Sequence, residues 1–359
     1  MRIGIVAEQL RQQVPGGIGT YVRGLVGGLV ALDDPALTLE LVASAGPTPD
    51  PLAQLGPSVV QSRLGHRAQM AAWSMGFGAA RSQHLDLLHL TSLAGPMRGS
   101  QRRTVMVHDL SWRRYPELTT RRGARWHEAA FGRAVASSAR LIVPSVPVLE
   151  DVLDAGVDRA RVTVIGEGSD HLGPPDHDAS NEVLEALGIA GQYLLTVSTL
   201  EPRKNLNALC DARQEAIDEG APPWPLLVAG PQGWGPEMPD RPGVHLLGPV
   251  DSATLAGLYA GCGAFVYVPV AEGFGLPPLE AMALGALVVA SSATPSMIDA
   301  PVLASCDASD RRSIREALGL ALGADASAGE LRDLGVAYAQ RHRWVDVAAE
   351  HLTLWKQDA

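Results

Sequence analysis

Residues 271–285 read AEGFGLPPLEAMALG, and they directly follow a short apolar run at 264–268 that is typical of a buried parallel strand. Gly273 and Gly275 have no side chains, so the backbone N–H groups of this loop can approach a ligand closely. Pro278 predicts that a helix begins nearby, because proline is favoured in a first helical turn. The positive end of a helix attracts anions, and the stretch therefore predicts a site next to a phosphate group.

Two glutamates in this stretch are candidate ligands for sugar hydroxyls. Glu272 is expected on the loop and Glu280 in the first turn of the helix. An ionised carboxylate accepts two hydrogen bonds side by side, which suits the vicinal hydroxyls of a ribose or a hexose. Glu280 alone is also explained by helix capping and compensation of the helix dipole. The pair favours one carboxylate for each of two sugars.

A second motif, VSTLEPRKN at 197–205, ends the first predicted strand of the C-terminal half. Ligands of open α/β sheets bind outside the carboxyl ends of the strands, so Arg203 and Lys204 are expected to face the same crevice as the glutamate loop. Arginine offers a planar fork and lysine a compact charge, and both favour phosphate oxygens. The motif thus predicts a diphosphate clamp, although two adjacent basic residues on their own are more often solvated surface.

Two loops of the N-terminal half carry weaker signals. PGGIGTY at 15–21 resembles a dinucleotide fingerprint, but its third glycine is missing, which argues against a dehydrogenase. Gly17 allows close backbone approach to a phosphate, and a simple tight turn explains it equally well. His108 and Asp109 end a predicted strand in VHDLSWRRYPE at 107–117. His108 is a candidate donor to a sugar hydroxyl or to developing charge, and the alternative is a helix cap at Asp109 beside a structural histidine.

The chain as a whole alternates short apolar runs with longer helical stretches, which is the pattern of parallel strands joined by crossover helices. Predicted strands span 2–7, 39–43, 87–90, 104–108, 141–144 and 162–165, then 193–197, 226–229, 244–246, 264–268 and 287–290. Predicted helices include 19–32 and 123–136. Between the two sets, GEGSDHLGPPDHDAS at 166–180 is rich in Gly, Pro, Asp and Ser, so we place a domain boundary near Asp170.

Two domains are expected from 359 residues, at 1–170 and 171–340, with a helix at 341–359. Trp344, Ala348, Leu352 and Trp355 form an apolar stripe on this last helix. The stripe either caps the second domain or crosses back onto the N-terminal domain. Loops of the first domain, at 7–19, 45–67 and 108–125, are expected to select an acceptor.

The formal net charge of −10 argues against a nucleic-acid partner. The segment at 98–133 is nevertheless basic. Its arginines are Arg98, Arg102, Arg103, Arg113, Arg114, Arg121, Arg122, Arg125 and Arg133. A solvated helix face explains them, and the functional interpretation is a contact for an anionic acceptor or for membrane headgroups.

Cysteines and the N-terminal residues bear on cellular location. Cys210, Cys262 and Cys306 are widely separated, and the sequence has neither a paired-cysteine ligand set nor an HExxH motif, so no disulfide, metal or bound cofactor is predicted. The first residues, MRIGIVAE, are too short an apolar run for a signal peptide or a membrane span. We expect a cytoplasmic protein, with any membrane association peripheral at the inner face.

The four motifs, in this order, resemble the retaining glycosyltransferases of family 4. Glu272 and Glu280, eight residues apart in EGFGLPPLEAMALG, match the family's E(x7)E motif, which is highly specific. The resemblance covers nearly the whole chain. It implies an α/β protein of the GT-B fold, with two facing Rossmann-like domains and a cleft between them: an acceptor-binding domain first and a nucleotide-sugar donor-binding domain second.

The resemblance also implies a role for each matching residue. Glu280 would bind the ribose and Glu272 the donor sugar, while Arg203 and Lys204 would hold the diphosphate and stabilise the leaving group. The other implied donor contacts are Gly17, Phe274, Gly275 and Leu276 through their backbone, Val250 near the base and His108 at the transferred sugar. Transfer would retain the anomeric configuration without a metal ion or a side-chain base, from a UDP-linked or GDP-linked sugar to a glycan, a glycolipid or a small molecule.

Two departures and several alternatives stay open at this point. Ser198 stands where relatives commonly have glycine, and 291–307 lacks the usual acidic residue and glycine, which puts the donor preference in doubt. A sugar phosphorylase, a nucleotide-sugar epimerase, a degenerate paralogue acting as a binding subunit and a nucleotide-binding oxidoreductase are the competing interpretations. The oligomeric state is not readable from the sequence.

Overall fold

The computed structural model describes residues 1–75, 84–99, 101–137, 139–235, 238–324 and 328–357. The chain divides into two compact units, each with its own parallel sheet. Met1–Gly168 and Trp344–Ala359 form the first unit, and Ser169–Arg343 form the second. In the part of the chain that is described, no helix combines the length and the apolar character needed to cross a bilayer.

The first unit contains a sheet of seven parallel strands in the order β3-β2-β1-β4-β5-β6-β7. Its strands are β1 (Arg2–Val6), β2 (Thr38–Ala43), β3 (Ser58–Gln61), β4 (Leu87–Leu90), β5 (Arg102–Met106), β6 (Arg140–Val143) and β7 (Val162–Val164). Its helices are α1 (Gly16–Ala31), α2 (His66–Ser74), α3 (Ser111–Arg114), α4 (Arg121–Ala136), α5 (Val146–Asp154) and α12 (Trp344–Gln357). Short 3-10 turns occur at Glu8–Arg11, Pro51–Leu55, Pro116–Leu118 and Arg159–Arg161.

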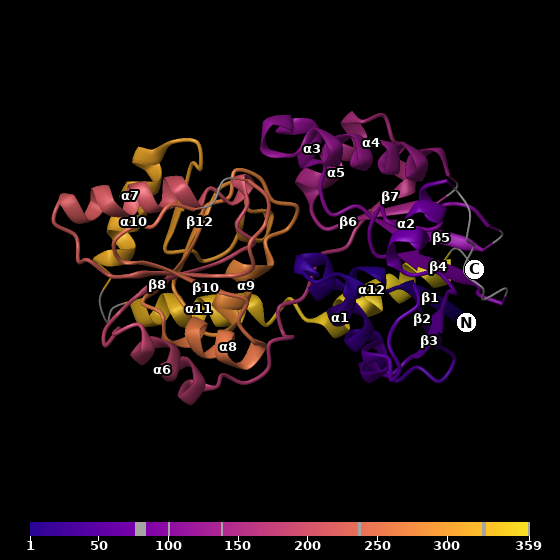
Figure 1. Ribbon diagram of the computed structural model, residues 1–359, viewed down its shortest axis with the longest axis horizontal. Coiled ribbons are helices and arrows are strands. Elements are labelled where there is room, and N and C mark those ends of the chain that lie inside the picture. The colour runs from indigo at the N-terminus through magenta and orange to yellow at the C-terminus, as the bar shows by residue number, and fades with distance from the viewer. Residues whose placement is uncertain (76–83, 100, 138, 236–237, 325–327, 358–359) are drawn as a thin grey trace. The chain divides into compact units, whose positions relative to one another are not determined.

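The second unit contains six parallel strands in the order β10-β9-β8-β11-β12-β13. They are β8 (Leu194–Val197), β9 (Leu226–Ala229), β10 (Val244–Gly248), β11 (Ala264–Tyr267), β12 (Val288–Ser291) and β13 (Ala304–Cys306). The helices are α6 (His177–Ala186), α7 (Leu206–Asp218), α8 (Ser252–Gly261), α9 (Leu276–Ala283), α10 (Arg311–Leu322) and α11 (Gly329–Ala339), and 3-10 turns lie at Pro202–Lys204 and Pro295–Met297. Figure 1 shows α7 and α10 on one face of this sheet and α6, α8, α9 and α11 on the other.

Burial on both faces explains the apolar strands. Every residue of β4, β9 and β11 is buried, because helices cover both sides of each sheet. The expected α/β class with two parallel sheets is therefore confirmed. The sequence patterns did not predict the edge strands β3 and β13, which are short and partly exposed and so lack a continuous apolar run.

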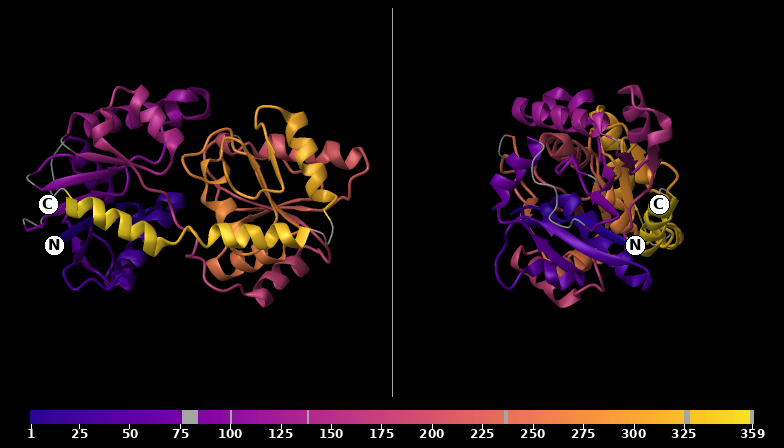
Figure 2. Two further views of the ribbon diagram at one scale, coloured as in Figure 1. Left: turned by 180° about the vertical axis from the view of Figure 1, so that it is seen from behind. Right: turned by 90° about the vertical axis from the view of Figure 1, so that its right-hand side faces the viewer.

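The last helix, α12, lies along α1 within the first unit and is yellow in Figure 2. Glycines of α1 make this close approach possible, because a Cβ at Gly28 would lie 2.2 Å from the carbonyl oxygen of Trp344. Polar groups also join α12 to the sheet. The hydroxyl of Tyr21 lies 2.9 Å from Nε2 of His89 and 2.9 Å from Nε2 of His351, and all three side chains are fully buried.

Candidate functional site

The glutamate loop connects β11 to α9 in the second unit, and its shape depends on Gly275. This residue has φ 99°, and a Cβ added there would lie 2.4 Å from Cγ2 of Thr294. Ser296 braces the loop, since its Oγ donates to the carbonyl of Gly275 at 2.7 Å and its N–H donates to the carbonyl of Phe274 at 2.9 Å. Phe274 and Leu276 are buried on either side. The helix begins near Pro278, as expected, but two residues earlier, at Leu276. The expected position of Glu280 in the first turn was therefore wrong, and Glu280 lies in the second turn.

Two cations and a tyrosine converge on Glu272. Lys204 Nζ binds Oε1 of Glu272, and Nη1 of Arg203 lies 3.2 Å from the same oxygen. The hydroxyl of Tyr267 donates to this oxygen at 3.1 Å and accepts from Nζ of Lys204 at 2.8 Å. Backbone contacts support the arrangement, since the N–H of Val270 donates to the carbonyl of Arg203 at 2.9 Å. The structure therefore brings together the three charged residues that the two separate motifs predicted.

Glu201 holds Arg203 from the other side. Its Oε1 lies 3.1 Å from Nε and 3.0 Å from Nη2 of Arg203. Burial raises the pKa of Glu201 above its usual value even though Arg203 and Lys204 favour its charged form. Burial, and then the charge of Glu272, raise the pKa of Tyr267, which therefore remains a proton donor at neutral pH. Lys204 makes, among the described residues, two of the three hydrogen bonds that an ammonium group can donate, which leaves one for a ligand oxygen.

Glu280 is buried and has partners of its own. Tyr259 donates its hydroxyl to Oε2 at 2.9 Å, and Nε2 of His171 lies 3.1 Å from Oε1. Burial, followed by the charge of Glu280, raises the pKa of Tyr259, so this hydroxyl keeps its proton and can orient the carboxylate. Val250 follows β10 and is half-buried.

His108 follows β5 in the first unit, and both of its ring nitrogens have partners. Nε2 lies 2.9 Å from the carbonyl oxygen of Thr91, and Nδ1 lies 3.4 Å from Oε1 of the buried Glu167. Burial alone would lower the pKa of His108, but Glu167, the carbonyl of Thr91 and the charge of Asp109 together outweigh it and raise this pKa. Both partners are acceptors, so the charged imidazolium, with two N–H donors, fits this position. A sugar hydroxyl would have to replace one of these partners.

Asp109 and Gly17 complete the sequence-predicted positions of the first unit. Oδ1 of Asp109 accepts from the N–H of Ser111 at 2.9 Å and from its hydroxyl at 2.6 Å, as a residue at a helix start does. Gly17 lies exposed in the first turn of α1, where an added Cβ would meet nothing within 4 Å. Packing therefore does not require a glycine at position 17.

A further polar cluster lies after β1, β2 and β3, beside the loops expected to select an acceptor. The buried carboxylate of Glu8 accepts from the N–H of Ser44 at 2.6 Å and from its hydroxyl at 2.8 Å. Nδ1 of the half-buried His66 lies 2.5 Å from the same carboxylate. Over the residues that the structure describes, no group of three or more His, Cys, Asp or Glu is arranged to hold a metal ion.

Sequence reasoning missed the tyrosines and histidine that orient the glutamates. Tyr259 lies 21 residues before Glu280 in the chain, and Tyr267 lies in the strand just before the loop of Glu272. Each tyrosine is equally explained as an apolar core residue. His171 lies in the segment interpreted only as a hinge. One signal was available, because Tyr267 lies at the carboxyl end of its strand, where ligands of parallel sheets bind.

Comparison with known proteins follows the same division of the chain. Residues 15–171 match the family model described as Glycosyltransferase Family 4. Residues 191–318 match the family model described as Glycosyl transferases group 1. Together these two segments take in most of the chain.

Relatives of known activity include two mannosyltransferases of Escherichia coli. The O-antigen chain mannosyltransferase B is 29% identical over 271 residues, which are 71% of this chain and 70% of the relative. The serotype-specific mannosyltransferase WbdA is 29% identical over 195 residues, which are 49% of this chain but only 23% of that longer protein.

Solved structures with the same fold have low sequence identity. HepE of Anabaena, in complex with UDP and glucose, superimposes with a TM-score of 0.75 at 17% identity, covering 99% of this chain and 100% of HepE. Sucrose-phosphate synthase of Thermosynechococcus elongatus gives 0.76 at 19% identity over 99% and 98% of the two chains. WaaG, a glycosyltransferase involved in lipopolysaccharide biosynthesis, gives 0.69 at 15% identity over 98% of each. These likenesses confirm the expected GT-B fold.

Proposed function

This chain belongs to the group 1 glycosyltransferases of family 4, and we propose that it moves a hexose from a nucleotide-diphosphate sugar to a hydroxyl acceptor with retention and without a metal ion. Both mannosyltransferase relatives favour mannose as the hexose. They also favour a growing glycan as the acceptor and glycan biosynthesis as the process. The proposed setting is the cytoplasm or the inner face of a membrane.

The observation that carries the proposal is the cluster of Arg203, Lys204 and Glu272. Breaking the bond between a sugar and a diphosphate leaves negative charge on the leaving phosphate oxygen. Fixed cations at that point lower the barrier, because they need no rearrangement as the charge develops. Arg203 and Lys204 are already held in place by carboxylates and by the hydroxyl of Tyr267. They supply the positive charge that a metal ion provides in other transferases.

The two glutamates divide the donor between them in this proposal. Glu280, oriented by Tyr259 and His171, accepts hydrogen bonds from the ribose hydroxyls. Glu272 accepts from the sugar hydroxyls while it positions the cations. The backbone of Phe274, Gly275 and Leu276 approaches the sugar and the phosphates, and Val250 lies near the base.

The chemical step requires no protein base. The acceptor hydroxyl attacks the anomeric carbon on the face from which the diphosphate departs, and the departing phosphate oxygen takes the hydroxyl proton. Retention of configuration follows from attack and departure on one face. His108, as an imidazolium, donates to the transferred sugar by exchanging its longer contact, the one with Glu167.

A calorimetric titration with EDTA present tests the donor site. UDP, GDP and ADP are titrated first and their sugar conjugates next, into the wild type and into Lys204→Ala and Glu280→Ala. We expect one nucleotide to bind and both variants to lose at least tenfold in affinity, since charge-assisted hydrogen bonds contribute about 1.5–3 kcal/mol each. Lys356→Ala is the matched control, because Lys356 is an exposed residue of α12 and pairs with Asp34. Absence of binding to every nucleotide would refute the donor assignment.

Product analysis tests the reaction class. With GDP-mannose and a mannose-terminated glycolipid, we expect a glycoside with the same anomeric configuration as the donor by NMR, formed equally well with EDTA. An inverted product would refute retention, and activity that depends on added Mg²⁺ would refute metal independence. Release of an isomerised sugar without glycoside formation would favour the epimerase alternative.

Gly17 allows a direct test of a backbone contact with the donor. Gly17→Ala adds a methyl group into open space in the structure, so folding is preserved and the helix gains about 0.5–1 kcal/mol. If a phosphate approaches this backbone, the methyl group raises KM for the donor about tenfold or more. Gly27→Ala, an exposed position in the same helix with equally open space, is the control. Equal KM values for the two variants would remove Gly17 from the site.

A further inference from the structure

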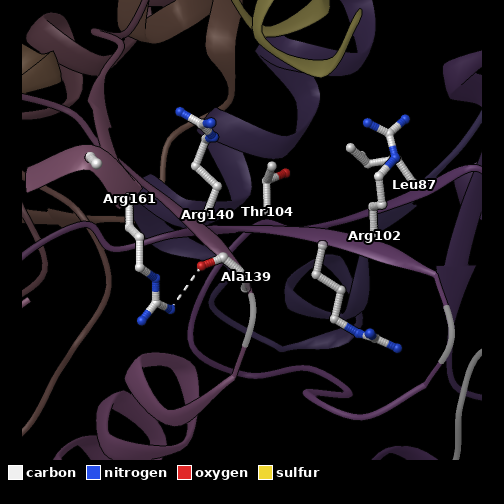
Figure 3. A pocket seen from close by; sticks show the side chains of 8 residues that line it. Leu87, Arg102, Thr104, Ala139, Arg140 and Arg161 are labelled. Atoms are coloured by element: carbon white, nitrogen blue, oxygen red, sulfur yellow. Dashed lines mark hydrogen bonds between the residues drawn. The ribbon is translucent and has the colours of Figure 1, made fainter. Parts of the chain in front are cut away.

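A glutamine and a histidine of the first unit lie close together beyond the carboxyl ends of β1 and β3. Gln12 follows the 3-10 turn after β1, and His66 begins α2 after β3. Their Nε2 atoms are 3.4 Å apart. His108 follows β5 at this same end of the parallel sheet. The pocket in Figure 3 is lined by the first residues of β4, β5 and β6 and therefore lies at the opposite end.

The buried Glu8 fixes the orientation of the His66 ring. Its carboxylate accepts from the N–H of Ser44 at 2.6 Å and from the hydroxyl of Ser44 at 2.8 Å, so its own position is set by backbone and side chain together. Nδ1 of His66 lies 2.5 Å from Oε1 of Glu8 and donates to it, because a carboxylate only accepts. The other ring nitrogen, Nε2, is thereby directed toward Gln12.

Contacts of the neighbouring residues also hold the backbone of Gln12 in place. The N–H of Gln12 donates to the carbonyl of Gln9 at 3.1 Å, and Nε2 of Gln9 donates to the carbonyl of Pro15 at 2.8 Å. Arg11 binds both carboxylate oxygens of Asp50, at 2.7 Å and 2.5 Å. The turn is therefore fixed while Gln12 itself is exposed. A ligand that binds its amide has little backbone freedom to remove.

Together the two side chains present one donor and one acceptor to a small polar group. With Nδ1 donating to Glu8, a neutral His66 has a lone pair on Nε2, and the amide nitrogen of Gln12 carries two N–H donors. Their direct contact of 3.4 Å is long for a hydrogen bond, so a ligand that replaces it loses little. A hydroxyl group both donates and accepts. One hydroxyl placed between the two nitrogens can therefore satisfy both.

The same pair distinguishes a hydroxyl from an anion. If His66 carries a second proton, a hydroxyl accepts from Nε2 and donates to the amide oxygen of Gln12, since an amide can turn over. A hydroxyl thus fits both protonation states of the histidine. A phosphate or carboxylate group only accepts, so it fits the charged state alone. The pair therefore favours a neutral polyol, such as a sugar, over an anionic ligand.

Gln69 gives a second indication of a ligand at this place. It lies three residues after His66 on the same face of α2, and only 3% of it is exposed. Its Oε1 has no hydrogen-bond partner among the described residues. Buried polar atoms in proteins are nearly always hydrogen-bonded, so this oxygen is one donor short. A ligand hydroxyl beside His66 would supply such a donor.

We propose that Gln12 and His66 bind a hydroxyl group of a neutral acceptor glycan, and that Glu8 is the residue that positions His66. This assignment rests on the proposed function, because it names residues that hold the acceptor of the transfer reaction. It makes Gln12 and His66 determinants of acceptor specificity. Neither residue takes part in the bond-breaking step.

The surroundings of the pair suit a glycan. β1 and β5 are two strand spacings apart, about 10 Å, so this hydroxyl site lies apart from a sugar held at His108. Val14 and Leu64 each lie two residues from one member of the pair, and both are exposed apolar side chains. Apolar side chains around a few placed polar groups are typical of small-molecule sites, and here they can cover the apolar face of a sugar ring.

Binding without turnover tests this site separately from the reaction. Mannobiose, maltose and lactose, with glucose 6-phosphate as the anionic probe, are titrated into the protein without any nucleotide. The ring signals of His66 are followed by NMR and assigned through His66→Asn. We expect a neutral disaccharide to shift these signals and to leave those of His245 in the second unit unchanged. His66 signals that no neutral disaccharide moves overturn the proposal, as do signals that only glucose 6-phosphate moves.

Kinetics with GDP-mannose and a mannose-terminated glycolipid measure the contribution of each residue. The variants are Gln12→Ala and His66→Asn, whose amide can still donate to Glu8 but has no atom in the place of Nε2. Each should raise the KM for the acceptor about threefold to tenfold and change the KM for the donor less than twofold. Because both residues bind one hydroxyl, the double variant should raise the acceptor KM by less than the product of the two effects. Gln214→Ala, an exposed glutamine of α7, is the control.

The positioning role of Glu8 has its own test. Glu8→Gln should raise the acceptor KM in the wild type but add nothing in His66→Asn, where the oriented nitrogen is already missing. A purely structural Glu8 would lower activity in both backgrounds. If the wild type transfers sugar and neither Gln12→Ala nor His66→Asn changes the acceptor KM, the proposal is overturned. If the wild type transfers no sugar, the proposed function fails, and the disaccharide titration still decides for or against this site.

Discussion

Ser198 follows β8, and its hydroxyl has no hydrogen-bond partner among the described residues although the side chain is buried. A buried polar group without a partner costs about 1–3 kcal/mol of stability. Ser198→Ala should therefore raise the free energy of unfolding by about 1 kcal/mol, measured by chemical denaturation. Ser291→Ala is the matched control, because that hydroxyl donates to the carbonyl of Pro269 at 2.8 Å and its loss should destabilise. Equal effects of the two substitutions would contradict this account.

Glu167 should set the pH range in which His108 is charged. The pKa of His108 is raised in the folded protein, so the stabilising contact with Glu167 is fully present below the unfolded pKa of about 6.5 and is lost as pH rises through the folded value. If the imidazolium contacts the sugar, kcat/KM falls on the alkaline side of its pH profile. Glu167→Gln should move that fall to lower pH by about one unit.

The control for this pH profile is Glu128→Gln, which removes an exposed carboxylate that binds Arg113 in the same unit. Its profile should match the wild type. A profile of Glu167→Gln that keeps its shape and position while overall activity drops would show that Glu167 acts only on folding. A profile without an alkaline fall would remove the charged His108 from the reaction.

Individual residues were predictable only where local sequence carried the signal. Glu272, Arg203 and Lys204 could be expected at one site, because each follows a predicted strand and carboxyl ends of parallel strands share one edge of a sheet. The partners of Glu280 could not be predicted from the sequence, because tertiary packing brings Tyr259 and His171 to it. Motif spacing carries no information about such contacts.

Among the elements, the central strands were readable because burial on both faces requires continuous apolar runs. The edge strand β3 has only two apolar residues, and its exposure removes that requirement. The first residue of α9 was harder to predict than the presence of the helix. Pro277 and Pro278 both suit a first turn, whereas the actual start at Leu276 is set by Gly275 in a left-handed conformation.

The contact between α1 and α12 can be tested at Gly28. A Cβ at this position would lie 2.2 Å from the carbonyl oxygen of Trp344, a backbone atom that cannot rotate away. Gly28→Ala should therefore destabilise the first unit by about 1–3 kcal/mol through overpacking, despite the better helix propensity of alanine. Gly27→Ala, which meets open space on the same helix, should stabilise it by about 0.5–1 kcal/mol. Unfolding in urea measures both, and two shifts of the same sign would contradict this packing.

For the whole molecule, the sequence indicated two domains but left the last helix open. The contact division falls between Gly168 and Ser169 and again between Arg343 and Trp344, so the first unit is built from both ends of the described chain. The apolar stripe on α12 predicts that this helix packs on a core, but it cannot say which core, because either apolar surface would bury the same side chains. The sequence also did not predict that His351 is buried, because a single histidine on an apolar helix face does not indicate which residue it contacts.

Acid should destabilise the first unit through a chain of neutral hydrogen bonds that joins α12 to the sheet. Nδ1 of His351 donates to the carbonyl of Val347 at 2.8 Å, so its Nε2 must accept the proton of the Tyr21 hydroxyl. The oxygen of Tyr21 then accepts from Nε2 of His89, whose Nδ1 accepts from Oγ1 of Thr104 at 2.8 Å. Every donor meets one acceptor only while both histidines are neutral.

Burial keeps them neutral, since it lowers the pKa of His351 to about 4 and that of His89 well below its usual value. Below pH 6.5 these histidines bind protons in the unfolded chain but stay neutral in the folded chain. The free energy of unfolding should therefore fall by about 1.4 kcal/mol per pH unit for each such histidine until the folded pKa is reached. Thermal unfolding between pH 7.5 and 4.5 should therefore depend less steeply on pH in His351→Gln than in the wild type. His245→Gln, a partly exposed position in the second unit, should keep the wild-type slope. If His351→Gln keeps that slope as well, His351 takes up its proton without unfolding the unit, and the neutral chain does not control its acid stability.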